Sequence, residues 1–179
     1  YVKFNKYKVQ ISGDNLVILE PNGGKHEIFY TNFGQKKIPW IGDPKIFFEC
    51  SGKFTVAKKC SVYLKGNTKT VIISATSWDA EKTLVFGYNH KEYNPELKII
   101  SYGSCTVNAY MPFANWIQNN YQIIDSDVNV IHNIQEYRLE DNNTLNRKFC
   151  TLEKSANLLM DPINENNFIV NYTVIPYSG

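Results

Sequence analysis

The chain has 179 residues, of which 43% are hydrophobic and 20% charged, and its formal net charge is +2. This composition fits one folded domain or two small ones, and it is too apolar for a disordered chain. The small net charge provides no electrostatic footprint for nucleic acid or for an anionic membrane surface, so neither is expected as a partner.

The cysteines indicate a cellular compartment and argue against a metal site. No C-x-x-C pair occurs and the three histidines are scattered, so we expect no metal centre. Unclustered thiols fit the reducing cytoplasm, where we expect the protein. No apolar run reaches the roughly 18 residues of a membrane helix, and YVKFNKYKVQ at the start lacks a signal-peptide core, so no membrane association is expected. The four cysteines are Cys50, Cys60, Cys105 and Cys150.

The first elements along the chain are a hairpin and a loop. NLVILEPNGGKHEIFY, residues 15–30, contains two strand-like runs around Pro-Asn-Gly-Gly, which predicts a β-hairpin. FGQKKIPWIGDPK, residues 33–45, has two glycines and two prolines and predicts a loop.

Residues 45–102 alternate short apolar runs with helical or loop segments. FTVAKKCSVYL, residues 54–64, repeats Val56, Cys60 and Leu64 at four-residue intervals, which predicts a short helix. Short apolar strands separated in this way are typical of a parallel sheet covered on both faces. The strand-like runs are KIFFEC, KTVIISA, LVFGY (84–88) and LKIISY.

A longer helix and two further strands follow. The apolar residues of CTVNAYMPFANWIQNN, residues 105–120, fall on one helical face. SDVNVIHNIQEY, residues 126–137, alternates apolar and polar residues, and FIVNYTVIP, residues 168–176, is apolar, so both predict strands. Residues 139–167 are polar, rich in asparagine and weakly periodic, which indicates a loop or a partly ordered segment.

The stretch IISYGSCTVNA, residues 99–109, places the Cys105 thiol where the predicted helix begins. Unpaired backbone N–H groups and the positive end of the helix dipole favour a thiolate there. The plainer interpretation is a small buried hydrophobe, as free cysteines usually are. His132 lies on the strand after the helix, and a strand in that place commonly pairs near the strand before the helix, so we expect its imidazole to approach the thiol. A cysteine activated by a histidine attacks carbonyl carbons.

The segments around Cys105 resemble the glyceraldehyde-3-phosphate dehydrogenase family. VIISATSWDAEKTLVFGYNHKEYNPELKIISYGSCTVN is similar to the family's stretch up to its S-x-S-C-T-x-N catalytic turn. FFECSGKFTVAKKCSVYLKG resembles the family's E-x-T-G-x-F strand and helix, and GYNHKEY resembles G-V-N-H-x-x-Y. The matches keep their order and spacing from about Lys45 to His132, roughly half of the chain.

The resemblance implies an α/β fold. Residues 1–104 would form a partial Rossmann-type dinucleotide-binding sheet, and residues 105–179 would form the start of an α+β catalytic domain. It also implies a phosphorylating, NAD(P)-dependent aldehyde dehydrogenase in which Cys105 forms a thiohemiacetal and His132 is the base. The implied cofactor is NAD or NADP, the substrate a small-molecule aldehyde, phosphorylated or not, and the assembly a homo-oligomer.

The resemblance carries further roles onto residues near the catalytic turn. Ser104, Thr106 and Arg138 are candidates for substrate binding. A helix cap explains Ser104 equally well, and a surface arginine is the plainer interpretation of Arg138. Asn108 is expected to bond the backbone of the turn.

The cofactor candidates stand at the ends of two predicted strands, and capping of the sheet ends explains them almost as well. Dinucleotides bind at the carboxyl ends of parallel strands. The four candidates are Ser51, Gly52, Ser74 and Ala75.

The chain also departs from the family pattern. It contains no G-x-G-x-x-G, so we expect it to begin within the cofactor domain and to bind NAD poorly by itself. HNIQEYR replaces the family's H-x-x-T-x-x-Q, and Val174 stands where a phosphate-binding arginine is expected. One alternative is therefore a non-catalytic relative or fragment that acts as a binding or structural subunit. Another is a cysteine acyl transferase or esterase without NAD.

Overall fold

The computed structural model describes residues 6–34, 37–134 and 150–176. Contacts between residues divide the chain into two compact units, Tyr1–Gly42 and Asp43–Gly179. Among the described residues, no helix combines the length and the apolarity that a membrane span needs.

The first unit holds a three-stranded antiparallel sheet in the order β1-β2-β3. The predicted hairpin is confirmed, because β2 (Asn15–Leu19) and β3 (Lys25–Phe29) pair around the glycine-containing turn. β1 (Lys8–Ser12) was not predicted, and all five of its residues are exposed. It joins β2 through a tight turn in which Gly13 has φ +59°, a conformation that favours glycine.

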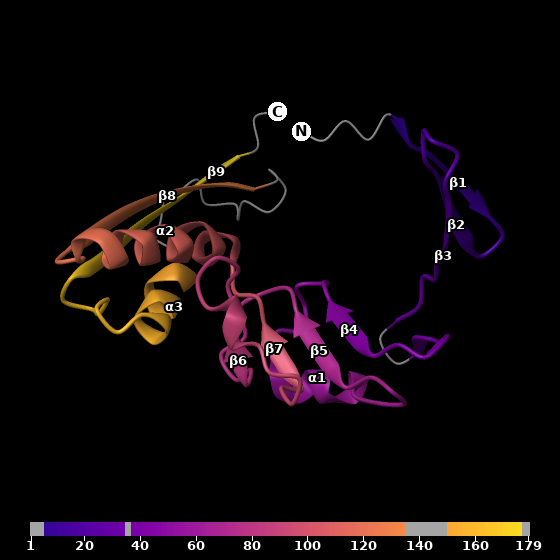
Figure 1. Ribbon diagram of the computed structural model, residues 1–179, viewed down its shortest axis with the longest axis horizontal. Helices are drawn as coiled ribbons and strands as arrows, with labels where there is room; N and C mark the ends of the chain where they lie inside the picture. The colour runs from indigo at the N-terminus through magenta and orange to yellow at the C-terminus, as the bar shows by residue number, and fades with distance from the viewer. Residues whose placement is uncertain (1–5, 35–36, 135–149, 177–179) are drawn as a thin grey trace. The chain divides into compact units, whose positions relative to one another are not determined.

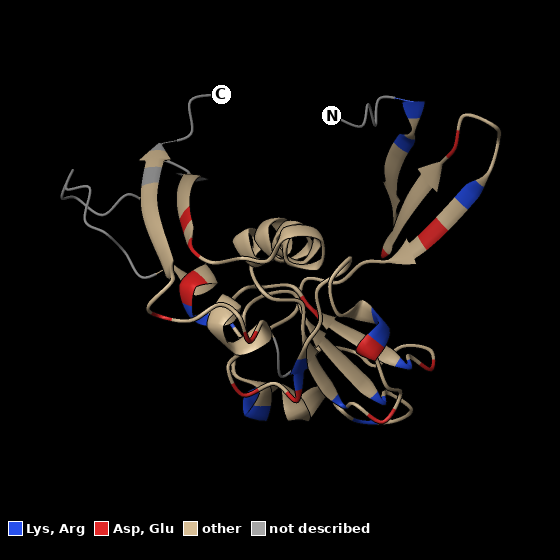
Figure 2. Ribbon diagram, turned by 60° about the vertical axis from the view of Figure 1, so that its left-hand side comes forward, with Lys and Arg blue, Asp and Glu red and all other residues tan. Residues whose placement is uncertain are grey.

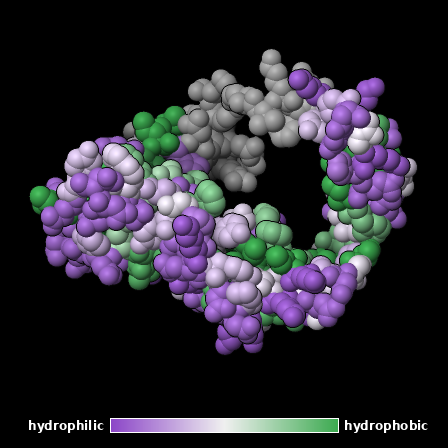
Figure 3. Space-filling model, viewed as in Figure 1, coloured by the Kyte–Doolittle hydropathy of each residue, from purple (hydrophilic) through white to green (hydrophobic). Residues whose placement is uncertain are grey.

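The second unit begins with a parallel sheet in the order β4-β5-β7-β6 (Figure 1). β5 and β7 are buried along their whole length, while Ile46 and Phe48 of the edge strand β4 are exposed, and apolar surface is visible over this part of the sheet (Figure 3). On one face, Tyr63 stacks on Phe47 with ring centroids 4.1 Å apart. The bounds of the strands are β4 Ile46–Glu49, β5 Thr70–Ile73, β6 Lys82–Thr83 and β7 Ile99–Ser101, and the short helices are α1 Ala57–Cys60, η3 Ser61–Tyr63 and η4 His90–Glu92.

Three of the four predicted strands of this sheet are confirmed, but the strand predicted at 84–88 is wrong. The strand there is β6, Lys82–Thr83, and the chain turns directly after it. The N–H of Val85 donates to Asn89 Oδ1 at 2.7 Å, and the carbonyl of Val85 accepts from the N–H of Tyr88. Gly87 has φ +84°. Val85 is fully buried. The apolar residues at 84–88 therefore reflect burial of side chains and not an extended backbone.

The rest of the second unit contains α2 (Cys105–Tyr121), β8 (Ser126–Ile134), α3 (Thr151–Leu159) and β9 (Phe168–Pro176). β8 and β9 are parallel, a pairing that requires a crossover connection, and α3 lies in that connection. α3 contacts both α2 and β9, and α2 and α3 lie side by side in Figure 1.

The helix α3 corrects, for residues 151–159, the prediction of a loop or a partly ordered segment across 139–167, of which 139–149 lie outside the described residues. Leu152, Ser155 and Ala156 are buried at helical spacing, so a short apolar face holds the helix against the core. The same core cluster includes Met111 of α2 and Phe168 of β9, both almost completely buried. The chain therefore has mixed α/β content with parallel sheets.

Candidate functional site

The turn before α2 sets the position of Cys105. Gly103 has φ +70°, and a Cβ there would lie 3.2 Å from Cγ1 of Val107, so the turn is suited to glycine. Ser104 is the N-cap of α2, and its Oγ accepts the N–H of Val107 at 3.3 Å. Ser104 Oγ also lies 3.0 Å from Oγ1 of Thr106. Cys105 is the first residue of this 17-residue helix, and it is exposed.

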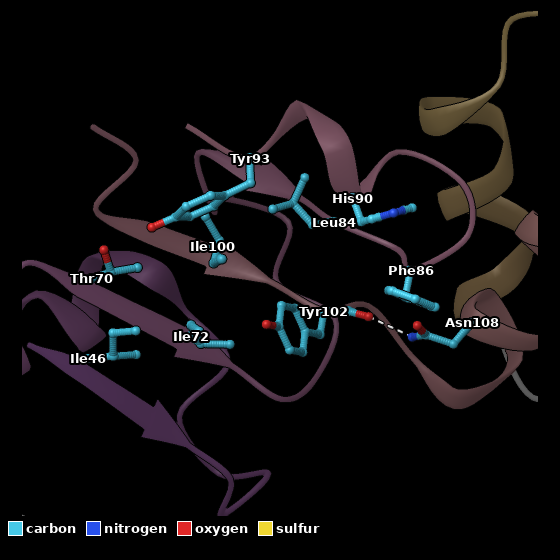
Figure 4. Close-up of a pocket in the computed structure, with 10 residues that line it drawn as sticks. All are labelled: Ile46, Thr70, Ile72, Leu84, Phe86, His90, Tyr93, Ile100, Tyr102 and Asn108. Atoms are coloured by element: carbon cyan, nitrogen blue, oxygen red, sulfur yellow. Dashed lines mark hydrogen bonds between the residues drawn. The ribbon is translucent and has the colours of Figure 1, made fainter. Parts of the chain in front are cut away.

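Asn108 ties the same turn together from inside the helix. Its Nδ2 donates to the carbonyl of Tyr102 at 2.6 Å, as Figure 4 shows, and to the carbonyl of Ser104 at 3.0 Å. The expectation that Asn108 bonds the backbone of this turn is confirmed. One side chain thus spans the residues on both sides of Gly103.

His132 reaches Cys105 because β8 returns along the length of α2. The helix rises about 24 Å from its first residue to its last, and the strand covers about 20 Å between Ser126 and His132. The two lengths nearly match, so His132 comes back to the start of the helix. Its Nε2 lies 3.6 Å from Sγ of Cys105, within hydrogen-bonding reach of a sulfur atom.

The helix that carries the thiol has no charged side chain. α2 carries no lysine, arginine, aspartate or glutamate, and the helix is free of charged residues in Figure 2. Its positive N-terminal end is therefore not neutralised by a carboxylate in its own first turn, and such an end favours anions. The ring of Tyr172 lies beside His132, and burial, followed by electrostatic interaction with Cys150 and Cys105, raises the pKa of its hydroxyl.

The cofactor candidates lie at one edge of the parallel sheet, at the carboxyl ends of β4 and β5. The N–H of Ser74 donates to the carbonyl of Glu49 at 2.9 Å, and the N–H of Tyr102 donates to the carbonyl of Ile73 at 3.0 Å. These bonds align the ends of β4, β5 and β7, and β7 leads to Cys105. The side chain of Ser101, the last residue of β7, donates to the carbonyl of Ala75 at 2.7 Å.

The turn after β4 is open to a ligand on its outer side. Gly52 has φ +70°, and a Cβ built there would meet nothing within 4 Å, so another group can approach its backbone closely. Ser51 and Ser74 are exposed. The N–H and the hydroxyl of Ser51 both donate to Oε1 of the buried Glu49, whose Oε2 accepts from Tyr63 at 3.2 Å. These features fit the approach of a dinucleotide.

A cavity of about 440 Å³ lies over the parallel sheet (Figure 4). Its walls are mainly apolar and aromatic side chains of β4, β5, β7 and residues 84–93. Asn108 and Tyr102 line it as well, so it reaches the first turn of α2, whereas Cys105 and His132 are not among its lining residues.

The structure gives no geometry for the predicted substrate contact of Arg138. Arg138 lies outside the described residues, as does the rest of 135–138, whereas Val174 lies on β9 opposite His132. Within residues 6–34, 37–134 and 150–176, no group of three or more His, Cys, Asp or Glu side chains is placed to hold a metal ion.

Sequence reasoning did not identify three residues that contact these turns, the start of α1 or His132: Glu49, Asp79 and Tyr172. Asp79 accepts the N–H groups of Ala57 and Lys58 at the start of α1, at 2.8 and 3.1 Å. A carboxylate two residues ahead of Ser51-Gly52 at a strand end was a usable signal for Glu49. Asp79 and Tyr172 contact residues that are far away in the sequence, and a local sequence pattern cannot predict such contacts.

Comparison with known proteins gives a consistent result, although the chain matches no protein-family model. It is 38% identical over 135 residues to the glyceraldehyde-3-phosphate dehydrogenase of Sclerotinia sclerotiorum and 36% identical over 128 residues to that of Podospora anserina. It is 35% identical over 137 residues to the glyceraldehyde-3-phosphate dehydrogenase of Pisum sativum that is named cytosolic.

These matches cover 73, 71 and 74% of this chain and 39, 36 and 40% of the three relatives. The chain thus spans about two fifths of the length of the proteins it matches. Such identity over nearly three quarters of the chain shows that it is related to the glyceraldehyde-3-phosphate dehydrogenase family.

Proposed function

We propose that this chain carries the thiol and imidazole of an NAD(P)-dependent aldehyde dehydrogenase similar to glyceraldehyde-3-phosphate dehydrogenase. One observation carries the proposal: Sγ of Cys105 lies 3.6 Å from Nε2 of His132 at the first residue of a 17-residue helix. The names of the relatives support the reaction class. The alternative of a non-catalytic subunit is not favoured by the comparisons.

The first step is the attack of the Cys105 thiolate on the carbonyl carbon of an aldehyde. A carbon–sulfur bond forms, and the electron pair of the carbonyl π bond moves to the oxygen. The free N–H of Cys105 at the helix start points toward the developing negative charge and stabilises it. His132 holds the thiol proton and delivers it to the oxygen, which gives a thiohemiacetal on Cys105.

The second step oxidises the thiohemiacetal carbon. NAD or NADP, when bound, supplies the hydride acceptor. As the hydride leaves the carbon, His132 takes the proton of the hydroxyl group, and a thioester remains on Cys105. His132 releases its proton to solvent, and phosphate or water attacks the acyl carbon. The carbon–sulfur bond breaks, the sulfur leaves as the thiolate, and His132 takes the proton of an attacking water.

The chain's contribution to cofactor binding would come from the sheet edge. The open backbone of Gly52 and the exposed hydroxyls of Ser51 and Ser74 suit a polar dinucleotide, with Ala75 beside them. In this proposal residues 1–104 belong to a Rossmann-type cofactor domain and residues 105–179 to the catalytic domain. A homo-oligomer and a cytosolic location are part of the same proposal.

For the substrate, Thr106 and Ser104 are the proposed contacts next to the nucleophile. Ser104 already caps α2, so its hydroxyl has a structural partner that a substrate contact would have to share. Arg138 remains a proposal for a substrate phosphate. The aldehyde itself is proposed only as a small molecule, with or without a phosphate group.

The proposal is tested by trapping the acyl enzyme. The protein is incubated with NAD or NADP and glyceraldehyde 3-phosphate or a simple aldehyde, without inorganic phosphate, and its intact mass is measured. We expect an acyl adduct, mapped to Cys105, together with reduced nicotinamide. Cys105→Ser should abolish the adduct, whereas Cys50→Ser, at the other exposed thiol, should leave it unchanged. Absence of both the adduct and reduced cofactor with each aldehyde would contradict the proposal.

A further inference from the structure

Tyr172 lies beside His132 on the neighbouring strand. In the β8–β9 ladder Val130 is opposite Tyr172 and His132 is opposite Val174, so Tyr172 and His132 are diagonal neighbours. Residues spaced by two on a strand point to the same face. The ring centroids of His132 and Tyr172 are 6.0 Å apart with an interplanar angle of 50°, a tilted contact. Aromatic pairs are attractive at centroid separations of about 4.5–7 Å.

The far side of Tyr172 is fixed by the core. Tyr172 packs against the cluster of buried residues that α2, α3 and β9 share, and it is itself half-buried. Burial is the main cause that raises the pKa of its hydroxyl, so the ring stays uncharged at neutral pH. Tyr172 therefore offers His132 a rigid, neutral aromatic surface.

His132 borders solvent, so a fixed neighbour on its other side restricts the orientation of the imidazole. It lies near the end of β8 and is half-exposed. An imidazole in this position loses side-chain conformational freedom when it is held in one orientation toward a thiol. A neighbouring ring that blocks other orientations lowers the population of conformers in which Nε2 points away from Cys105.

We infer that Tyr172 is a positioning residue whose ring holds the imidazole of His132 against the Cys105 thiol. The inference rests on the proposed function, since it assumes that the Cys105–His132 pair acts as a unit. It assigns the effect to the aromatic ring and not to the hydroxyl group. A phenylalanine at this position should therefore serve as well as the tyrosine.

The test measures the rate of alkylation of Cys105 by iodoacetamide at neutral pH in the full chain, with peptide mapping by mass spectrometry. Tyr172→Leu should lower the rate about fivefold, the effect expected from loss of one aromatic contact. Tyr172→Phe should keep the wild-type rate. The alkylation rate of Cys50, the other exposed thiol, should be the same in all variants.

A double-mutant cycle separates positioning of the imidazole from a general loss of structure. In a His132→Ala background, Tyr172→Leu should have no further effect on the Cys105 rate, because the group that it positions is gone. A further loss in that background, or a slow Tyr172→Phe variant, would overturn the inference. A nuclear Overhauser contact between the two rings is expected in the wild-type protein, and its absence would overturn the inference even if Tyr172→Leu does not fold.

The outcomes also distinguish the inference from the proposed function. If His132→Ala slows Cys105 alkylation and Tyr172→Leu does not, only the role of Tyr172 is wrong. If His132→Ala leaves the rate unchanged, the thiol–imidazole pair itself is not assembled, and both proposals fail.

Discussion

Two strand-to-helix turns of this protein each present an exposed cysteine, and their differences show how a thiol becomes a candidate nucleophile. Cys50 follows β4 and Cys105 follows shortly after β7, and each turn contains a glycine with φ +70°, Gly52 and Gly103. Cys50 precedes its glycine and lies ahead of the start of α1 at Ala57. Cys105 follows its glycine and is itself the first residue of α2.

The N-termini of α1 and α2 also differ in the groups that bind their free N–H groups. α1 has four residues and no side-chain cap of its own, and the carboxylate of Asp79 binds its first N–H groups. α2 has 17 residues, is capped by the neutral hydroxyl of Ser104 and has no acidic residue in its first turn. A carboxylate thus neutralises the end of α1, whereas the end of α2 remains available to a thiolate.

The largest effect should follow from removing the core anchor of α2. Met111 is completely buried in the cluster that joins α2, α3 and β9, so Met111→Ala should lower the free energy of unfolding by about 2–5 kcal/mol. Phe113→Ala, at a 58% exposed position of the same helix, should change it by less than about 0.5 kcal/mol. Urea unfolding of the two variants measures both values. Equal losses would show that α2 is not held by this face.

The cap of α2 should have a smaller effect. Ser104→Ala removes the side-chain acceptor for the N–H of Val107, and the free energy of unfolding should fall by about 1 kcal/mol. Ser104→Asn keeps an oxygen at the N-cap and should restore most of the loss. If alanine is tolerated as well as asparagine, the hydrogen bond of Ser104 does not stabilise the helix start.

The smallest effect is expected at Asp79, and it depends on pH. The N–H groups of Ala57 and Lys58 lower the pKa of this carboxyl below its ordinary value. The contribution of a carboxyl with a lowered folded-state pKa is present above the ordinary pKa, about 4, and is lost as the pH falls through the folded-state value. Asp79→Asn should therefore be less stable than the wild type near neutral pH, with the difference shrinking below about pH 4.

Unfolding at a series of pH values tests this expectation. Asp14→Asn, at an exposed aspartate of the β1–β2 turn, is a matched control. Its difference in free energy of unfolding from the wild type should not depend on pH in this way. A stability difference for Asp79→Asn that stays constant down to low pH would mean that the charge of Asp79 does not support α1.

Local patterns predicted the elements whose causes are local. The turn glycines defined the β2–β3 hairpin, alternation defined β8, and the helical face defined α2. The same rules failed at residues 84–88, where Asn89 and Gly87 turn a buried apolar run away from the sheet. They also missed α3, whose apolar face consists of few large residues and becomes visible only through its contacts with α2 and β9.

The candidate site divides in the same way. The contacts at the start of α2 join residues that are close in the sequence, so local patterns could predict them. They are the position of Cys105, the Ser104 cap and the bonds of Asn108. The approach of His132 was expected from pairing of its strand near the strand before the helix, but β8 pairs with β9 in a separate sheet. The approach follows instead from the matched lengths of a helix and a returning strand. Tyr172 depends on the register between two strands joined through α3, and sequence spacing does not specify that register.

The most direct test of the account is the ratio of the iodoacetamide alkylation rates of Cys105 and Cys50 within one protein at neutral pH. The account predicts that Cys105 reacts about tenfold faster than Cys50 and that His132→Ala removes most of this advantage. His26→Ala, at a histidine on β3 of the antiparallel sheet, should leave the ratio unchanged. Equal rates for the two thiols, unaffected by His132→Ala, would contradict the assembly of a catalytic thiol–imidazole pair in this chain.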